Sequence, residues 1–296
     1  MSTATPKVTA ATWRTFGLGV CLVSALSALP LARLVRFALQ SNLQSHILLI
    51  PLISAYLLYH DRHAIFQRPA SATDGRRVAL LTGLAALMLL ALHAALTASN
   101  RISSEAGALC LPIMAYITLL LGAFLACFGR AAFHAALFPL LFLYVMVPIP
   151  DAATHVMGVA LQHGSAAATH GLFLLTGTPV IRDGLTFFLP GLSLHVAEEC
   201  SGIHSTLALL ITSLVASKLY LQQLPSRVVL LLAVIPLCLL RNGIRVVTLA
   251  LLTMHVDPGI MDSRLHHRGG PLFFALSLLL FFAILLGLRK WEKRNR

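Results

Sequence analysis

The chain has 296 residues, of which 58% are hydrophobic and only 11% are charged. A soluble domain typically carries about 25% charged residues, so this composition excludes an ordinary soluble fold and indicates a protein immersed in lipid. Lys and Arg outnumber Asp and Glu by 22 to 10, which gives a formal net charge of +12. These bases lie in short clusters between apolar runs, a pattern that favours membrane topology over nucleic-acid binding.

A membrane-spanning helix needs about 20 mostly apolar residues. Eight segments approach this length: 13–37, 45–60, 77–98, 105–127, 131–149, 201–218, 226–252 and 271–289. The second segment is short, and Pro51 could make it re-entrant. We therefore expect an all-α integral membrane protein with about eight transmembrane helices, folded as a single polytopic domain over residues 1–296.

The distribution of charge predicts the orientation of these spans. If both termini are cytoplasmic, Lys and Arg far outnumber Asp and Glu in the inner segments, whereas acids slightly outnumber bases in the outer ones. Arg241 and Arg245 are exceptions, because they lie within the seventh span. The sequence thus predicts cytoplasmic termini.

Residues 150–200 form a long outer segment before the sixth span. Residues 151–177 are rich in small residues and predict a helix that lies at the membrane interface. Residues 178–200 contain Gly, Pro and Asp turn signals between short β-prone pieces. A connection of this length is usually functional rather than a simple link.

Cys200 is the only one of the five cysteines that lies in a polar loop. It follows Glu198 and Glu199 and precedes Ser201 and Gly202 at the start of the sixth span. A helix N-terminus or a nearby cation lowers the pKa of a thiol from about 8.5 and makes it nucleophilic. Because adjacent carboxylates act in the opposite direction, a reactive Cys200 requires a cation nearby, and an inert interfacial cysteine is the alternative.

Arg241, Asn242 and Arg245 could supply that cation from the seventh span. An arginine at the centre of an apolar helix costs about 2.5–3.5 kcal/mol, so such residues face a polar cavity or a partner. Their spacing of three and four residues puts all three on one broad helix face. A structural ion pair with Glu198 or Glu199 is the alternative, and it suits Arg241 better than Arg245.

Histidines supply the remaining candidates. His266 or His267, just before the last span, could serve as a general acid and base, or both could belong to a solvated interface. His204, four residues after Cys200, is a weaker candidate partner for the thiol. His155, His163 and His170 follow helical spacing but lack accompanying acidic or cysteine ligands, so we expect a polar interfacial face and no metal site.

The motifs "VAEECSGIHS", "RNGIRV" and "HHRGG", in this order, resemble the exosortase/archaeosortase family. The likeness is clearest over residues 140–275, and "SHILLIPLISAYLL" at 45–58 is similar to an early family segment. The family's catalytic set is a Cys in an A-x-x-C-S-G context, an Arg in N-x-x-R and a downstream His. Carried over, these fall on Cys200, Arg245 and, from the spacing to Gly269–Gly270, His266. Glu199 and His204 depart from the family pattern.

This resemblance implies a membrane cysteine transpeptidase without a cofactor, located in a bacterial inner membrane with its site on the periplasmic face. Its partners would be exported proteins that carry a C-terminal sorting signal: a short motif such as Pro-Glu-Pro, a transmembrane helix and a basic tail. Cys200 would form an acyl-thioester, which is released to an unknown acceptor such as a lipid- or polysaccharide-linked group. Arg245 would stabilise the thiolate or the oxyanion, or donate a proton to the leaving amine, and electrostatic stabilisation suits its high pKa better. His266 would orient groups or move protons.

Two other classes remain open on the residues alone. A transporter or channel would use Arg241 and Arg245 to line a path, but it predicts repeated halves, and the sequence shows no repeat. A membrane thiol–disulfide enzyme needs a second outer cysteine, which the predicted topology does not provide.

Overall fold

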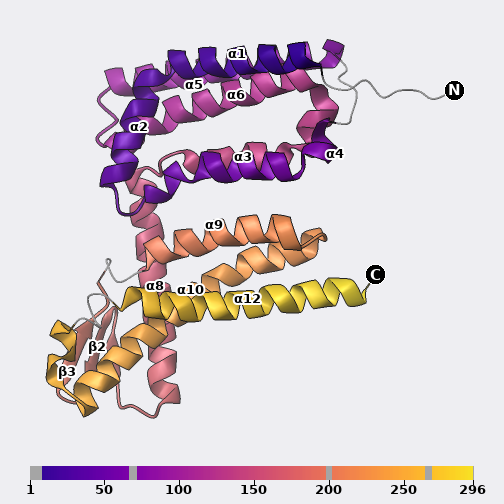
Figure 1. The fold of residues 1–296 in the computed structure, drawn as a ribbon. Coiled ribbons are helices and arrows are strands. Elements are labelled where there is room, and N and C mark those ends of the chain that lie inside the picture. The colour runs from indigo at the N-terminus through magenta and orange to yellow at the C-terminus, as the bar shows by residue number, and fades with distance from the viewer. Residues whose placement is uncertain (1–8, 67–71, 198–201, 264–268, 296) are drawn as a thin grey trace. The chain divides into compact units, whose positions relative to one another are not determined.

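A computed structural model of the chain describes residues 9–66, 72–197, 202–263 and 269–295 (Figure 1). It is mostly helical and forms two compact units, Met1–Ala153 and Thr154–Arg296. The all-α membrane class expected from the sequence is confirmed. The expectation of a single polytopic domain stays a prediction.

The first unit is built on two long antiparallel helices, α5 (Ala72–Ala98) and α6 (Glu105–Ala135). Its helices are α1 (Ala10–Leu26), α2 (Ala28–Gln40), η1 (Ser45–Leu48), α3 (Ile50–His60), α4 (Arg62–Phe66), α5 (Ala72–Ala98), α6 (Glu105–Ala135), α7 (Leu137–Phe142) and η2 (Leu143–Met146). Figure 1 shows α1, α5 and α6 side by side, and α1, α2 and α4 all pack on α6. Buried Gln44 holds the end of this unit through two hydrogen bonds with the backbone of Ile149, at 2.9 and 3.1 Å.

The second unit combines helices with a small sheet. It contains α8 (Asp151–Leu175), β1 (Ile181–Asp183), β2 (Thr186–Leu189), β3 (Leu192–His195), α9 (Ile203–Tyr220), α10 (Leu224–His255), η4 (Pro258–Asp262) and α12 (Gly270–Arg294). Helices α9, α10 and α12 share one core that includes Leu209, Leu230, Val234, Phe281 and Leu285. A three-residue link makes α9 and α10 antiparallel. Glu292, near the end of α12, contacts that link, so α12 also runs antiparallel to α10.

The predicted β-prone pieces form a three-stranded antiparallel sheet in the order β1-β2-β3. Both turns use a glycine with positive φ, Gly184 at +58° and Gly191 at +75°, and Pro190–Gly191 suits a tight turn. Buried Phe187 and Leu189 alternate with exposed Phe188. The buried side packs on α8 and on Val247 and neighbours near the C-terminal end of α10.

The number of spans differs from the expected eight. Among the described residues, five helices are long and apolar enough to cross a membrane, or up to seven if each of two bent helix pairs is one span. The bent pairs are α1 with α2 and α7–η2 with α8, so the predicted interfacial helix 151–177 appears as the second partner of a bent pair. Residues 45–60 give only a short apolar helix. A count of eight is therefore not confirmed.

Candidate active site

The site is positioned by the hairpin of α9 and α10. Tyr220 ends α9 and Leu224 begins α10 after a three-residue link. Both helices rise about 1.5 Å per residue. A residue in α9 therefore lies level with the residue of α10 that is the same number of residues from the link. Ile203, the first residue of α9, therefore lies level with Arg241. The hairpin thus brings the segment after Cys200 to the arginine-bearing turn of α10.

Gly202 and Arg241 meet at this level. Gly202 is the N-cap of α9 with φ +77°. The guanidinium of Arg241 occupies the space where a side chain on Gly202 would stand: its Nη2 would clash with an added Cβ, and its Cζ would lie 3.5 Å away. Arg241 is only 6% exposed. A buried cation therefore lies against the backbone two residues after Cys200 in the sequence.

The rest of the polar group follows Arg241 within about one turn of α10. Asn242 is fully buried at 0% exposure, and Arg245, one turn further along, is partly buried. Arg241 and Arg245 are close enough for their charges to interact. Within the described part of the chain, Nε of Arg241 is buried without a hydrogen-bond partner. This end of α10 therefore concentrates positive charge inside the unit.

The segment before Cys200 is anchored at the same end of the unit. The side chain of Gln162 on α8 is buried and donates from Nε2 to the carbonyl oxygen of Val196 at 2.6 Å. The amide of Val196 also donates to the carbonyl of Leu185 at 3.0 Å. Val196 and Gly202 are thus both held by buried contacts, one on each side of the cysteine motif.

The start of α12 lies at the same level. At the opposite end of the unit, the carboxylate of Glu292 accepts from the amides of Gln222 and Gln223 at 2.9–3.3 Å. Counting back along α12 from this contact places Gly270 level with Ile244 on α10. Gly269 is buried just before it. The described chain on either side of the histidine motif therefore belongs to the arginine end of α10.

Several predicted site residues lie outside the described residues. These are Glu198, Glu199, Cys200, His266 and His267. The described candidates are Arg241, Asn242 and Arg245, which lie together on α10, and His204. Cys200 and the histidine pair therefore stay predictions as members of the site.

The remaining candidate histidines are exposed or partly buried on α8 and α9. His204 is exposed, and because α9 begins at Ile203 with Gly202 in the left-handed region, helical spacing does not carry back from His204 to Cys200. His155 and His163 are exposed on α8. In the described ranges, no three His, Cys, Asp or Glu side chains are grouped as metal ligands would be.

Sequence reasoning did not identify two contributors to this geometry. Gln162 reads as one polar residue of a small-residue helix, and no spacing rule links it to Val196. The contact between Gly202 and Arg241 could be inferred from the sequence. The predicted ends of two adjacent spans determine which residues of the helical hairpin lie level with each other. The sequence alone favours a structural ion pair for Arg241.

One of the comparisons with known proteins identifies the family. A family model described as transmembrane exosortase matches residues 12–283, which is nearly the whole chain. No curated protein and no solved structure matches it. The match begins in α1 and ends in α12, so it includes the helices of both units and every motif described above. The chain belongs to the transmembrane exosortase family.

Proposed function

We propose that the protein is a cysteine transpeptidase that cleaves a C-terminal sorting signal of exported membrane-anchored proteins, with Cys200 as nucleophile. The observation that carries the proposal is the contact between the buried Arg241 guanidinium and Gly202, two residues after Cys200. It supplies the nearby cation that a reactive thiol requires beside Glu198 and Glu199.

The first half-reaction forms an acyl-enzyme. His266 takes the thiol proton, and the Cys200 sulfur attacks the scissile carbonyl carbon. The C–N bond then breaks, the leaving amine takes a proton from His266, and the substrate remains as a thioester on Cys200. In the second half-reaction an acceptor nucleophile attacks the thioester, its proton returns to the thiol, and the acylated acceptor leaves.

The arginines have a defined role in this scheme. Each buried guanidinium costs about 2.5–3.5 kcal/mol in a bilayer on insertion scales, a cost that negative charge at the site offsets. Thiolate and oxyanion both supply such charge. Arg245 stabilises the oxyanion, because a guanidinium stays protonated and donates in a fixed planar geometry. Arg241, buried against Gly202, positions the start of α9 and adds to the positive potential at the thiol.

The geometry also suits a membrane-embedded substrate. Helices α9, α10 and α12 are membrane-span candidates, and the arginine end of the unit is the end that carries the sheet. A sorting signal enters the bilayer through its own helix, so its motif lies just outside that helix. We place the site on the periplasmic side of a bacterial inner membrane, with both termini in the cytoplasm.

Trapping of the acyl-enzyme tests the proposal. With a membrane-embedded sorting-signal substrate, the parent enzyme should form a hydroxylamine-sensitive adduct on Cys200, and Cys200→Ala should form none and leave substrate uncleaved. Cys238→Ala is the matched control, because Cys238 is buried on α10 within one turn of Arg241. It should keep its activity. Normal processing by a Cys200→Ala enzyme would refute the thiol mechanism.

A further inference from the structure

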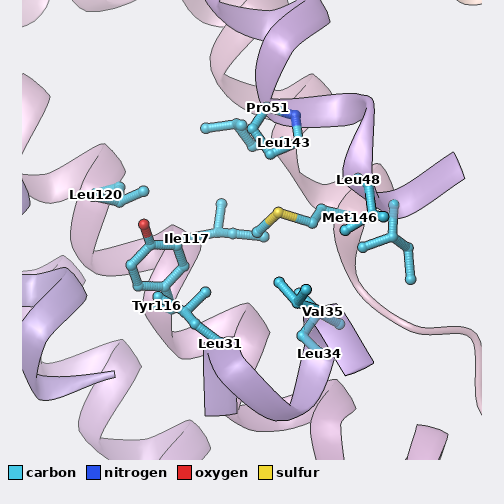
Figure 2. Close-up of a pocket in the computed structure, with 11 residues that line it drawn as sticks. Leu31, Leu34, Val35, Leu48, Pro51, Tyr116, Ile117, Leu120, Leu143 and Met146 are labelled. Carbon is cyan, nitrogen blue, oxygen red and sulfur yellow. The ribbon is translucent and has the colours of Figure 1, made fainter. Parts of the chain in front are cut away.

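The first unit contains two adjoining apolar cavities beside α3. The larger has a volume of about 640 Å³ and extends from Trp13 to Arg62 along α3 and α6. The smaller, of about 280 Å³, continues toward α2 and η1 and is drawn in Figure 2. Both are lined by Pro51, Leu120 and Leu143. We name the two together the α3 crevice.

One face of α3 forms the wall of this crevice. Pro51, Ser54, Ala55, Leu58 and Tyr59 line the larger cavity at helical spacing. Pro51 and Tyr59 are separated by about 12 Å along the helix, most of the roughly 15 Å depth of one hydrocarbon leaflet. Ala55 and Tyr59 are exposed, so the crevice is accessible from the side of the helix. Its length and access suit a chain that enters from the membrane.

Two hydroxyl groups in the wall already have partners. The Ser54 hydroxyl donates to the carbonyl oxygen of Pro139 at 2.7 Å. The Tyr116 hydroxyl is hydrogen-bonded to the Ser24 hydroxyl at 3.1 Å. A cavity lined in this way gives water few partners and favours an apolar occupant. Its volume is within the roughly 300–1,000 Å³ range of ligand pockets.

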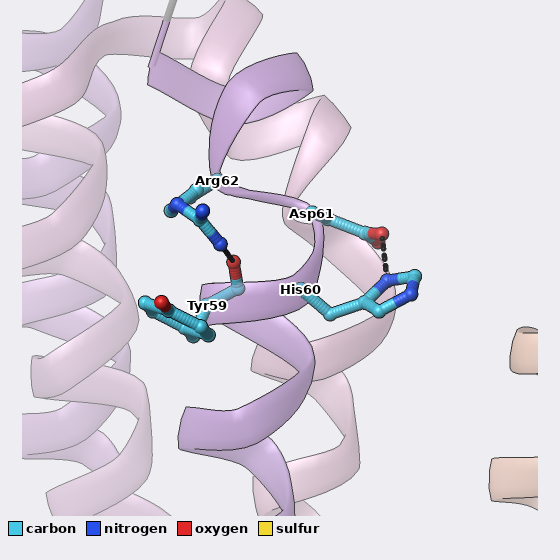
Figure 3. A network of polar contacts seen from close by, with 4 residues as sticks. All are labelled: Tyr59, His60, Asp61 and Arg62. Atoms are coloured by element: carbon cyan, nitrogen blue, oxygen red, sulfur yellow. Dashed lines mark hydrogen bonds and ion pairs between the residues drawn. The ribbon is translucent and has the colours of Figure 1, made fainter.

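Arg62 provides positive charge at one end of the crevice. Figure 3 shows its side chain folded back on α3, where Nη1 donates to the Tyr59 carbonyl oxygen at 2.9 Å and Cζ lies 4.1 Å from the Tyr59 ring centroid. This contact uses one of five N–H donors. The nearest acid, Asp61, points away from Arg62 and pairs with His60 at 2.9 Å. Trp13 and Tyr59 at this end are residue types enriched at membrane interfaces.

We propose that the α3 crevice binds an acyl chain of an anionic phospholipid, whose phosphate lies on Arg62. An apolar groove with a guanidinium at its interfacial end is complementary to an acyl chain with a negative headgroup. The transmembrane helix of a sorting signal fits worse, because its basic tail would emerge beside Arg62. With the proposed orientation of the chain, the lipid comes from the cytoplasmic leaflet.

Fluorescence quenching of Trp13 tests this proposal. The chain has two tryptophans, so Trp291→Phe leaves Trp13, which lines the crevice, as the sole reporter. In nanodiscs, phosphatidylglycerol with brominated acyl chains should quench Trp13 at about fivefold lower mole fraction than brominated phosphatidylcholine, the preference expected for one basic residue at the headgroup. In a Trp13→Phe protein, Trp291 reports from beside Arg289, Lys290 and Lys293, so any preference seen there should be unchanged by Arg62→Gln.

Matched variants test separately how Arg62 and the apolar wall of the α3 crevice contribute to lipid binding. Arg62→Gln should remove the preference for phosphatidylglycerol, and Arg14→Gln, an exposed base on α1 outside the crevice, should keep it. Ala55→Phe should weaken quenching by obstructing the crevice, whereas Leu52→Phe, exposed on another face of α3, should not. Equal quenching by both lipids, or a full preference in Arg62→Gln, would overturn the proposal. Protection of Trp13 by a sorting-signal peptide against both lipids would do the same, since the occupant would then be a helix.

Discussion

Gly202 is subject to two constraints. Its φ of +77° is in the left-handed region, and Arg241 occupies the side on which a Cβ would stand. For a non-glycine residue, that backbone conformation alone costs about 1–2 kcal/mol. An added side chain must also displace the buried guanidinium of Arg241. The glycine of the cysteine motif thus has a structural reason, because it lets α9 begin directly against Arg241.

Gly202→Ala should therefore lower turnover by about tenfold or more, since 1.4 kcal/mol of lost positioning is a factor of ten in rate. The measurement is cleavage of a sorting-signal reporter, normalised to enzyme in the membrane. Gly287→Ala is the control, because Gly287 is helical and has nothing within 4 Å of an added Cβ. Its activity should be unchanged. Wild-type turnover in Gly202→Ala would show that the contact with Arg241 does not position the site.

Arg241 and Arg245 should respond differently to lysine. Lysine keeps the charge but lacks the planar set of donors. If Arg245 binds the oxyanion, Arg245→Lys should lose most of its turnover at normal protein yield. Arg241→Lys should keep partial turnover and show its defect as lower yield, because Arg241 is 6% exposed and a misplaced charge there destabilises the fold. Reporter cleavage and membrane yield together distinguish the two, and a fully active Arg245→Lys enzyme would remove Arg245 from the proposed machinery.

At the scale of helices, close backbone approach joins α8 to α10. A Cβ on Gly243 would lie 3.1 Å from the amide nitrogen of Thr169 and 3.2 Å from the carbonyl carbon of Ala168. A Cβ on Gly164 would instead meet the side chain of Leu239, at 2.8 Å. Small residues at a helix crossing allow such an approach in membranes. The crossing lies beside Asn242, so it fixes the arginine-bearing turn against α8.

Gly243→Ala should accordingly lower the stability of the protein more than Gly164→Ala does. Its Cβ meets backbone, which can move only if the helices separate, whereas Leu239 can change rotamer in Gly164→Ala. We expect Gly243→Ala to lower the thermal midpoint in detergent by several degrees, corresponding to about 1–3 kcal/mol of overpacking. Gly164→Ala should shift it by less. The reverse ranking would indicate that α8 and α10 are not in contact at Gly243.

The differences between expected and observed helices follow from backbone chemistry rather than hydropathy. Residues 13–37 read as one apolar run, but Pro30 removes an amide donor and clashes with the carbonyl four residues before it, at Leu26. The chain accordingly breaks between α1 and α2, with a bend of 73°. The predicted gap between 127 and 131 coincides with Gly129, which has φ +77° inside α6. Hydropathy counts apolar residues and carries no information on helix direction. The eight predicted runs therefore correspond to five to seven candidate spans among the described residues.

The candidate site could be predicted from the sequence where it depends on residues that are close together in the chain. The motifs on α10 lie together as their spacing predicted, because three- and four-residue steps define a helix face. The anchoring of Val196 by Gln162 was not predictable, since it joins residues far apart in sequence through a single hydrogen bond. Packing of the sheet on α10 is likewise a tertiary contact. The alternating burial of β2 is also not visible in the sequence, because Phe187, Phe188 and Leu189 are all apolar.

At the scale of the whole molecule, the charges at the two ends of α9 and α10 differ. Lys218, Arg227, Arg289, Lys290 and Lys293 lie at the end where Glu292 holds the link between the two helices. The sheet and the arginine-bearing turn lie at the other end. Positive charge favours the cytoplasmic side, so the sheet end is expected to face outward.

The helix lengths turn this into a topology prediction. Helix α9 has 18 residues, about 27 Å at 1.5 Å per residue, which is close to the roughly 30 Å hydrocarbon thickness of a bilayer. Residues 178–195 and Lys218 must therefore lie on opposite sides of the membrane. Alkaline phosphatase fused within 178–195 should be active, and fusions at Lys218 and at the C-terminus should be inactive, with green fluorescent protein fusions showing the converse. Because α12 runs antiparallel to α10, the Lys218 and C-terminal fusions must agree with each other. Active phosphatase at Lys218 would invert the assignment, place Cys200 in the cytoplasm and end the proposal that the enzyme processes exported proteins.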